Sequence, residues 1–159
     1  MIKILAWQEL VLEVDGDTPV NRWIAPWSAF CRGRLRIRFL NRFGCFFLDR
    51  TDGRVEMLDV FYGQLEPIAE TAAEFEAMLT DPCWRQVYLL SEYVSRLHRA
   101  GKIAAEHDCY ALAPPPLIGG PDPWGEKNLP VEAAMVMEVE VLQRLYADHV
   151  AKALDADLA

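Results

Sequence analysis

The segment that most constrains the fold of this chain is residues 109–129, CYALAPPPLIGGPDPWGEKNL. It starts as a short apolar run, typical of a buried strand, and then enters three consecutive prolines, which fix φ near about −65° and remove three backbone donors. Gly119 and Gly120 follow, and glycine adopts positive φ values that other residues avoid. The segment therefore predicts a strand that leads into a loop of fixed shape.

Residues 34–60 predict three antiparallel strands. Over residues 34–39, arginines alternate with Leu, Ile and Phe. This two-residue repeat is typical of a strand with one buried face, so we expect the arginines to point one way and the apolar side chains the other. A second strand is predicted at residues 43–49 and a third at residues 54–60, joined by a tight turn at residues 51–53.

Helices are predicted in the second half of the chain. Thr71 and Glu74 match a capping box, which places the start of a helix after Thr71. Pro82 follows Asp81, and proline is favoured in the first turn of a helix, so a second helix is predicted from there to Arg99. Its apolar face comprises residues at helical spacing: Val87, Leu90, Val94 and Leu97.

Three further segments are less sharply defined. Residues 2–14 are apolar with interspersed acids and fit either a strand or a short helix. Residues 18–30 contain two prolines and are expected to be irregular, held to the body of the protein by Trp23 and Trp27. Residues 135–150 predict an amphipathic helix, although residues 135–141 alone also fit a strand.

These elements predict a single α+β domain over residues 1–159. The 52% apolar composition of the chain is sufficient for a domain of this length to bury roughly 70% of its unfolded surface. We expect an antiparallel or mixed sheet of about four to six strands, packed with about three helices.

The sequence gives no sign of a cofactor, a metal site or a membrane span. The four cysteines are widely spaced among apolar neighbours, so buried free thiols are expected: Cys31, Cys45, Cys83 and Cys109. No apolar run reaches the roughly 18 residues of a membrane span. Acidic residues interrupt the start of the chain before a signal peptide could form. We therefore expect a cytoplasmic protein without cofactor or metal.

Charge is unevenly distributed along the chain, whose formal net charge is −8. Residues 18–48 contain no acid and six arginines: Arg22, Arg32, Arg34, Arg36, Arg38 and Arg42. The acidic remainder argues against nucleic-acid binding and suits a basic protein partner. Two interpretations of the arginines remain open. Acids such as Glu56 or Glu74 pair with them across neighbouring elements, or they form a surface for an anion or an acidic partner.

No catalytic motif is present. His98, His107 and His149 are scattered, and no serine or cysteine lies in a recognisable nucleophile motif. Gly119 and Gly120 lack the flanking residues of phosphate-binding loops. A non-enzymatic protein is therefore expected.

Several weak signatures, spread over about residues 30–150, resemble one bacterial family. They include an aromatic-Leu-Asp strand end at residues 47–49, an Asp-Gly turn and a threonine-capped acidic helix, and they depend most on Gly63, Tyr110, Gly119, Gly120, Asn128 and Leu129. These features are similar to the C-terminal domain of type VI secretion DNase-immunity proteins, formerly a domain of unknown function and related in architecture to the SUKH superfamily. The resemblance leaves residues 1–30 as an N-terminal extension and residues 31–150 as the family-like region.

The resemblance implies a non-enzymatic immunity protein that binds and neutralises a cognate bacterial toxin, such as a nuclease, delivered by type VI or contact-dependent secretion. Such proteins commonly dock through complementary charge, and a nuclease must be basic to hold its substrate. The candidate partner-binding residues are the acids around the capped helix and one aromatic anchor: Glu66, Glu70, Glu74, Glu76, Asp81 and Trp124. Alternatively, the acids form only a solvated face, Trp124 packs the loop onto the sheet, and the chain is a regulatory adaptor without a toxin partner.

Overall fold

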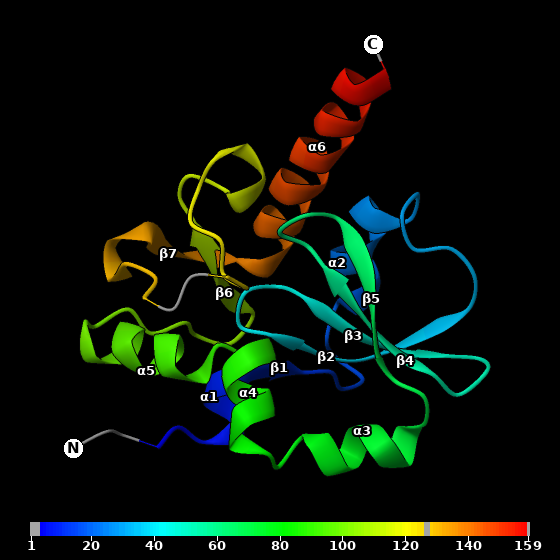
Figure 1. Cartoon of the computed structure of the whole chain (residues 1–159), viewed down its shortest axis with the longest axis horizontal. Coiled ribbons are helices and arrows are strands. Elements are labelled where there is room, and N and C mark those ends of the chain that lie inside the picture. The colour runs from blue at the N-terminus through cyan, green and yellow to red at the C-terminus, as the bar shows by residue number, and fades with distance from the viewer. Residues whose placement is uncertain (1–3, 126–127, 159) are drawn as a thin grey trace.

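The computed structural model describes residues 4–125 and 128–158 and confirms the α+β fold (Figure 1). One antiparallel sheet has five strands in the order β1 (Val11–Glu13), β2 (Leu35–Asn41), β3 (Phe46–Arg50), β4 (Val55–Asp59) and β5 (Gln64–Ala69). A second, two-stranded antiparallel sheet comprises β6 (Asp108–Leu112) and β7 (Ala134–Glu138). The α-helices of the described residues are α1 (Trp7–Leu10), α2 (Val20–Ile24), α3 (Ala72–Met78), α4 (Pro82–Tyr88), α5 (Ser91–Arg99) and α6 (Val139–Leu158).

The helices α3 and α4 begin after Thr71 and Asp81, and each of these residues caps its helix with its side chain. The Thr71 hydroxyl accepts a hydrogen bond from the backbone nitrogen of Glu74 at 3.1 Å, which satisfies a donor of the first turn of α3. The Asp81 carboxylate accepts from the backbone nitrogen of Cys83 at 2.9 Å and caps α4. The Glu74 side chain reaches the backbone nitrogen of Glu70 at 3.4 Å, one residue before the position that a capping box predicts.

The single helix predicted from Pro82 to Arg99 is wrong, because the chain breaks between α4 and α5. Leu90 adopts a left-handed conformation with φ of 52°, and the side-chain amide of Asn41 donates to the backbone oxygen of Tyr88 at 3.0 Å. Leu89 and Leu90, at the break, are both buried. Their burial is a local reason for the change in the direction of the chain. Val87, predicted on the buried face, is 54% exposed.

Residues 4–30 belong to the body of the protein. The segment left open between helix and strand contains both, α1 followed by β1, and β1 pairs with β2 in the main sheet. Within residues 18–30, where an irregular segment was predicted, residues 20–27 are helical, and Trp23 and Trp27 are buried as expected. The Trp27 indole donates to the Gln143 side chain of α6 at 2.7 Å, and Gln143 donates to the backbone oxygen of Gly44 at 2.8 Å.

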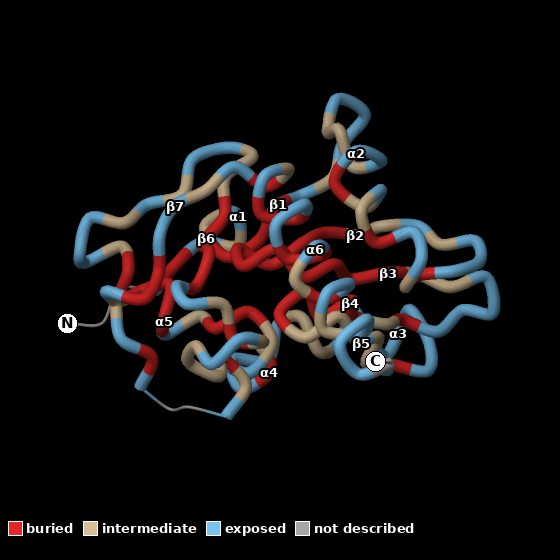
Figure 2. The backbone as a smooth tube through the Cα atoms, turned by 90° about the horizontal axis from the view of Figure 1, so that it is seen from above, coloured by how far each residue is buried: buried red, intermediate tan, exposed pale blue. Residues whose placement is uncertain are grey.

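The core is rich in aromatic side chains and runs through β3 and β4, which are buried along most of their length (Figure 2). Phe39 and Phe47 stack with ring centroids 4.8 Å apart. Phe75 of α3 and Trp84 of α4 both pack against Phe47. This contact fixes α3 and α4 over one face of the main sheet, the face that carries the candidate site described below.

The loop after β6 requires its two glycines for different reasons. Gly119 has a φ of 99° and no neighbour near its Cβ position. A Cβ at Gly120 would lie 1.7 Å from the backbone oxygen of Pro114, so this position requires glycine because two backbone segments approach closely. Beyond the loop, Leu129 is buried and Asn128 is exposed. Residues 126–127 of the predicted loop lie outside the described part of the chain.

The surroundings of Gly63 and Tyr110 also explain why these residues stand at their positions. Gly63 has a φ of 69°, and a Cβ there would lie 2.5 Å from the Val150 side chain of α6. The buried Tyr110 hydroxyl donates to the backbone oxygen of Lys102 at 2.8 Å and accepts from the backbone nitrogen of Ala104 at 3.1 Å. The close approach at Gly63 holds α6 against the turn before β5. The hydrogen bonds of Tyr110 hold β6 against the segment of chain that precedes β6.

Candidate functional site

The six predicted partner-binding residues lie on β5, the turn that follows it, α3, the start of α4 and the loop before β7. Glu70, Glu74, Glu76 and Asp81 are exposed, and Glu66 and Trp124 are partly buried. Glu74 and Asp81 have the capping roles described above, and Glu76 pairs with Arg38. Of the five acids, Glu66 is the one that lies beside Trp124, in a hollow described below.

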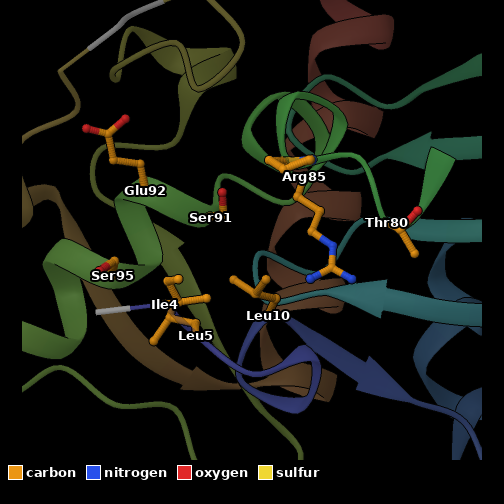
Figure 3. Close-up of a pocket in the computed structure, with 9 residues that line it drawn as sticks. Ile4, Leu5, Leu10, Thr80, Arg85, Ser91, Glu92 and Ser95 are labelled. Carbon is orange, nitrogen blue, oxygen red and sulfur yellow. The ribbon is translucent and has the colours of Figure 1, made fainter. Parts of the chain in front are cut away.

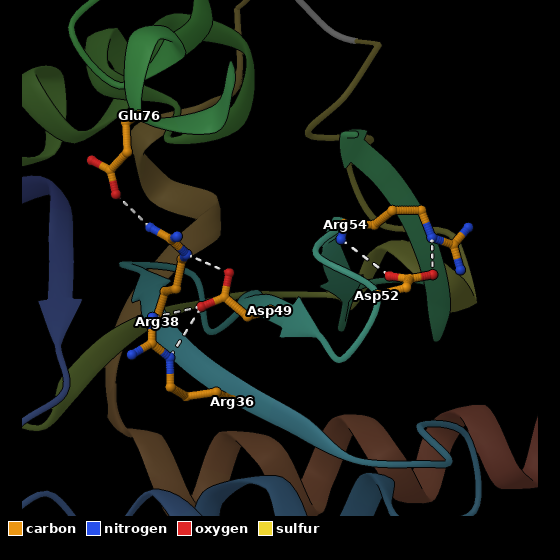
Figure 4. A network of polar contacts seen from close by, with 6 residues as sticks. All are labelled: Arg36, Arg38, Asp49, Asp52, Arg54 and Glu76. Carbon is orange, nitrogen blue, oxygen red and sulfur yellow. Dashed lines mark hydrogen bonds and ion pairs between the residues drawn. The ribbon is translucent and has the colours of Figure 1, made fainter. Parts of the chain in front are cut away.

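The arginines of β2 are largely paired with acids, as one of the two interpretations predicts (Figure 4). Arg36 donates twice to one Asp49 oxygen, at 3.1 and 2.7 Å, and Arg38 donates to the other at 2.6 Å. Arg38 also donates to Glu76 of α3 at 2.6 Å. The partners are therefore Asp49 and Glu76, whereas the predicted Glu56 pairs with Arg50.

Burial alone would raise the pKa of the Asp49 carboxyl, but hydrogen bonds and charge from Arg38 and Arg36 lower it below its ordinary value. The Arg38 guanidinium also lies over the Phe75 ring, 5.2 Å from its centroid. Arg38 is thus enclosed by two carboxylates and an aromatic ring, which leaves little of it for an external anion. Arg36, whose side chain is 75% exposed, remains accessible.

The strict alternation predicted for residues 34–39 is wrong beyond Ile37. Arg36 pairs with Asp49, but the register shifts after Ile37 so that Phe39 pairs with Phe47. Phe47 and Asp49 are two residues apart and share a face of the sheet, so Arg36 and Phe39 share that face too. The extra residue of this bulge explains why both arginines reach the same carboxylate.

A buried carboxylate holds the loop against the main sheet. Asp59, at the end of β4, is 3% exposed. One of its oxygens accepts from the backbone nitrogen of Phe61 at 2.9 Å, and the other accepts from the Trp124 indole nitrogen at 2.9 Å. The indole also packs edge-on against the Phe61 ring, with centroids 5.5 Å apart. Trp124 therefore does pack the loop onto the sheet.

Burial raises the pKa of Asp59 to about 6, against the opposing effect of the hydrogen bonds from Trp124 and the backbone of residues 61 and 62. Glu66 contributes further in the same direction as burial, because a second negative charge disfavours ionisation. A carboxyl that titrates near neutral pH inside a hollow is a common property of functional sites.

The Asp59 hollow, as we name it, has a volume of about 290 Å³. It lies between β4, β5, the end of α4 and the loop after β6 (residues 113–125), which we call the Pro/Gly loop. Its lining residues are Met57, Asp59, Glu66, Pro67, Val87, Tyr88 and Trp124. Met57 and Glu66 are direct cross-strand neighbours, and Asp59 shares their face because it is two residues from Met57. The hollow therefore combines two carboxylates with two aromatic side chains and the exposed Val87.

A larger hollow of about 420 Å³ lies between α1, α4 and α5 and is mainly apolar (Figure 3). Ile4, Leu5 and Leu10 line one side, and Arg85 lies opposite them. Arg85 is already engaged: its Nε donates to the backbone oxygen of Leu79 at 2.6 Å, and its guanidinium lies over the Trp7 ring. The arginine of this hollow is therefore already bound within the protein.

Sequence reasoning selected Trp124 and Glu66 but missed Asp59, Tyr88 and Val87. Asp59 had a signal, because it is the single acid in the apolar run of residues 57–61. Tyr88 and Val87 join the hollow because the chain breaks after α4, a break that periodicity did not predict.

Of the four cysteines, Cys83 is exposed, contrary to expectation, since it lies on the solvent side of α4.

No family model matches the chain, and no curated protein matches it. The described residues contain no group of three or more His, Cys, Asp or Glu side chains placed to hold a metal ion. In the same part of the chain, no helix combines the length and apolar character that a membrane span requires.

Proposed function

We propose that this chain is a non-enzymatic immunity protein that binds and neutralises a cognate bacterial toxin in the cytoplasm. The observation that carries the proposal is the Asp59 hollow, where two acids meet two partly buried aromatic side chains and the exposed Val87 on a protein of net charge −8. Aromatic side chains are the usual anchors of protein interfaces, and acidic surroundings attract a basic partner and speed its encounter.

The surroundings of the hollow fit a protein partner better than a small substrate. Glu70 and Glu74 are exposed on the segment that follows β5, so the acidic surface extends beyond the hollow itself. A nuclease toxin has a basic substrate-binding surface, and a partner that covers this surface with acids would block it. The resemblance of residues 30–150 to DNase-immunity domains favours the same class of partner.

The proposal is tested by co-expression with the product of the neighbouring gene in a host that this product kills when expressed alone. We expect rescue, and a stable complex on co-purification through a tag on either protein. Glu66→Lys should weaken rescue and complex formation, whereas Glu13→Lys, an exposed site on the opposite edge strand β1, should not. A neighbouring product that is not toxic, or toxicity that persists without a complex, would favour the regulatory adaptor instead.

A further inference from the structure

The Asp59 hollow contains negative charge that the described part of the chain does not balance. Asp49, Glu56 and Glu76 each have an arginine within ion-pair distance. Neither Asp59 nor Glu66 has a cationic partner among residues 4–125 and 128–158; Asp59 receives hydrogen bonds only from an indole and backbone nitrogens. A buried carboxylate of this kind is costly unless a cation pairs with it.

The walls of the hollow favour an organic cation. Trp124 and Tyr88 contribute aromatic rings, and Met57 and Val87 contribute apolar contacts around the two carboxylates. Aromatic rings attract cations through their negative faces, and arginine is the side chain most often found in such contacts. At about 290 Å³, the hollow is at or below the lower limit of pockets that hold drug-sized ligands, so it suits one side chain rather than a whole metabolite.

We propose that the Asp59 hollow binds the guanidinium group of an arginine side chain presented by the protein partner. This inference rests on the proposed function, because the protein partner supplies the arginine. Binding of a guanidinium group to the hollow can nevertheless be measured without the partner. A guanidinium group is preferred over an ammonium group for two reasons. It is planar and less strongly hydrated, so it stacks on an aromatic ring at lower desolvation cost, and its fork of five N–H donors suits a hollow lined by two carboxylates.

The hydrogen bonds already made by Asp59 leave room for this contact. The carboxylate accepts hydrogen bonds from the Trp124 indole and from the backbone of residues 61 and 62, and the two oxygens of a carboxylate together provide about four acceptor sites. The existing bonds fix the orientation of the carboxylate, so the cation would meet a preorganised acceptor. Glu66, on the neighbouring strand, is partly exposed and would meet the guanidinium from the solvent side.

Binding of a cation should depend on pH, because it requires the ionised form of Asp59. The groups that surround this carboxyl are Glu66 on β5, the Cys45 thiol beside β3, Tyr88 at the end of α4, and the hydrogen-bonded pair of Tyr62 and Asp122. The pKa of Asp59 is raised to about 6 in the free protein. A guanidinium group stays charged at all relevant pH values, so we expect its affinity to rise between pH 5 and pH 7.

The test titrates the folded full-length chain with N-acetyl-arginine methylamide and follows the NMR signal of the Trp124 indole N–H. Two probes of matched shape are controls: N-acetyl-citrulline methylamide, which is uncharged, and N-acetyl-lysine methylamide, which carries an ammonium group. We expect saturable binding of the arginine probe, several-fold tighter at pH 7 than at pH 5, and no saturable binding of citrulline. An equal response to citrulline would overturn the inference, and an equal or stronger response to lysine would overturn the assignment of guanidinium.

Variants separate a specific site from general charge attraction. Glu66→Gln should weaken binding of the arginine probe about tenfold, a typical effect of losing one charge-assisted hydrogen bond. Glu13→Gln, with the same change of net charge at the other edge of the sheet, should bind as the parent does. Equal affinities for the parent and Glu66→Gln would overturn the inference, even if Asp59→Asn failed to fold.

The two proposals fail in different ways. If the arginine probe binds as described but the neighbouring product forms no complex, the hollow is a guanidinium site and the proposed immunity function is wrong. If the complex forms and Glu66→Gln binds the partner as tightly as the parent does, the proposed function stands and the arginine inference is wrong.

Discussion

The Trp124 indole nitrogen donates a hydrogen bond to the Asp59 carboxylate at 2.9 Å and so joins the Pro/Gly loop to the end of β4. Sixty-five positions separate the two residues in the sequence. The same carboxylate accepts from the backbone nitrogen of Phe61, and the indole packs on the Phe61 ring. The loop is therefore held to the sheet by one buried acid, and this acid also lies at the base of the candidate site.

The indole hydrogen bond should contribute measurably to stability. Trp124→Phe keeps an aromatic ring against Phe61 but removes the donor, and it leaves an oxygen of the buried Asp59 without that partner. We expect a loss of about 1–3 kcal/mol in the free energy of unfolding, the usual cost of an unsatisfied buried acceptor. Chemical denaturation at pH 7 measures it. A change below a few tenths of a kcal/mol would show that water replaces the indole at no cost.

Asp59 should make the protein less stable as pH rises through the acidic range. Its pKa is raised from 3.8 to about 6 on folding, so between these values the folded state holds a proton that the unfolded state has released. The contribution of Asp59 to the free energy of unfolding is therefore fully present below about pH 4, and it is lost as the pH rises to about 6 and above. The shift of about two units corresponds to about 3 kcal/mol.

The variant Asp59→Asn isolates this effect, because it cannot titrate. We consider the difference in free energy of unfolding, parent minus variant. This difference should fall by an amount on the order of 2–3 kcal/mol between pH 4 and pH 6.5. Denaturation curves at a series of pH values measure the difference. Parallel pH profiles for the two proteins would contradict the raised pKa, whatever the absolute stability of the variant.

Gly119 and Gly120 provide a matched pair, since the same change to alanine acts through different causes. At Gly119 the φ of 99° is the only obstacle, because nothing lies near the added Cβ, and the expected cost is about 1–2 kcal/mol. At Gly120 the Cβ would overlap the backbone oxygen of Pro114, so the backbone must move and the cost should exceed about 3 kcal/mol. Melting temperatures of the two variants should therefore differ clearly, and the reverse order would contradict this account of the loop.

Local patterns in the sequence predicted the local parts of the fold. The alternation of residues 34–39, the turn at residues 51–53 and the Thr71 cap each depend on a few neighbouring residues, and each gives the expected type of element. The strand β5 was not predicted, because it is an edge strand that contains Pro67 and lacks a clear repeat.

The candidate site depends on contacts that no local pattern contains. The left-handed Leu90 turns α4 away from α5 and brings Tyr88 to the hollow. The Asn41 side chain, 47 positions earlier, donates to the backbone oxygen of Tyr88 at this break. Asp59 becomes a buried acceptor only when Trp124 packs over it. Sequence spacing could suggest that Trp124 and Glu66 were exposed to a partner, but not that both would line one hollow with a shared acid.

The paired arginines of β2 should contribute unequally to stability, although both contact Asp49. The Arg36 side chain is 75% exposed, and exposed ion pairs contribute about 0–1 kcal/mol. Arg38 is 14% exposed, contacts Asp49 and Glu76, and lies over the Phe75 ring. We expect Arg36→Met to change the free energy of unfolding by less than about 0.5 kcal/mol. Arg38→Met should lower it by about 1–3 kcal/mol, because Glu76 then loses its arginine and Asp49 keeps only Arg36.

Salt provides the second measurement on this pair. Raising the ionic strength to 1 M shortens the screening length to about 3 Å and weakens exposed charge pairs most. Since Arg38 is enclosed by side chains, most of the loss in Arg38→Met should persist at high salt. A loss that disappears with salt, or equal losses for the two variants, would mean that Arg38 is only a surface charge. In that case the arginines of β2 would again be candidates for binding an external anion.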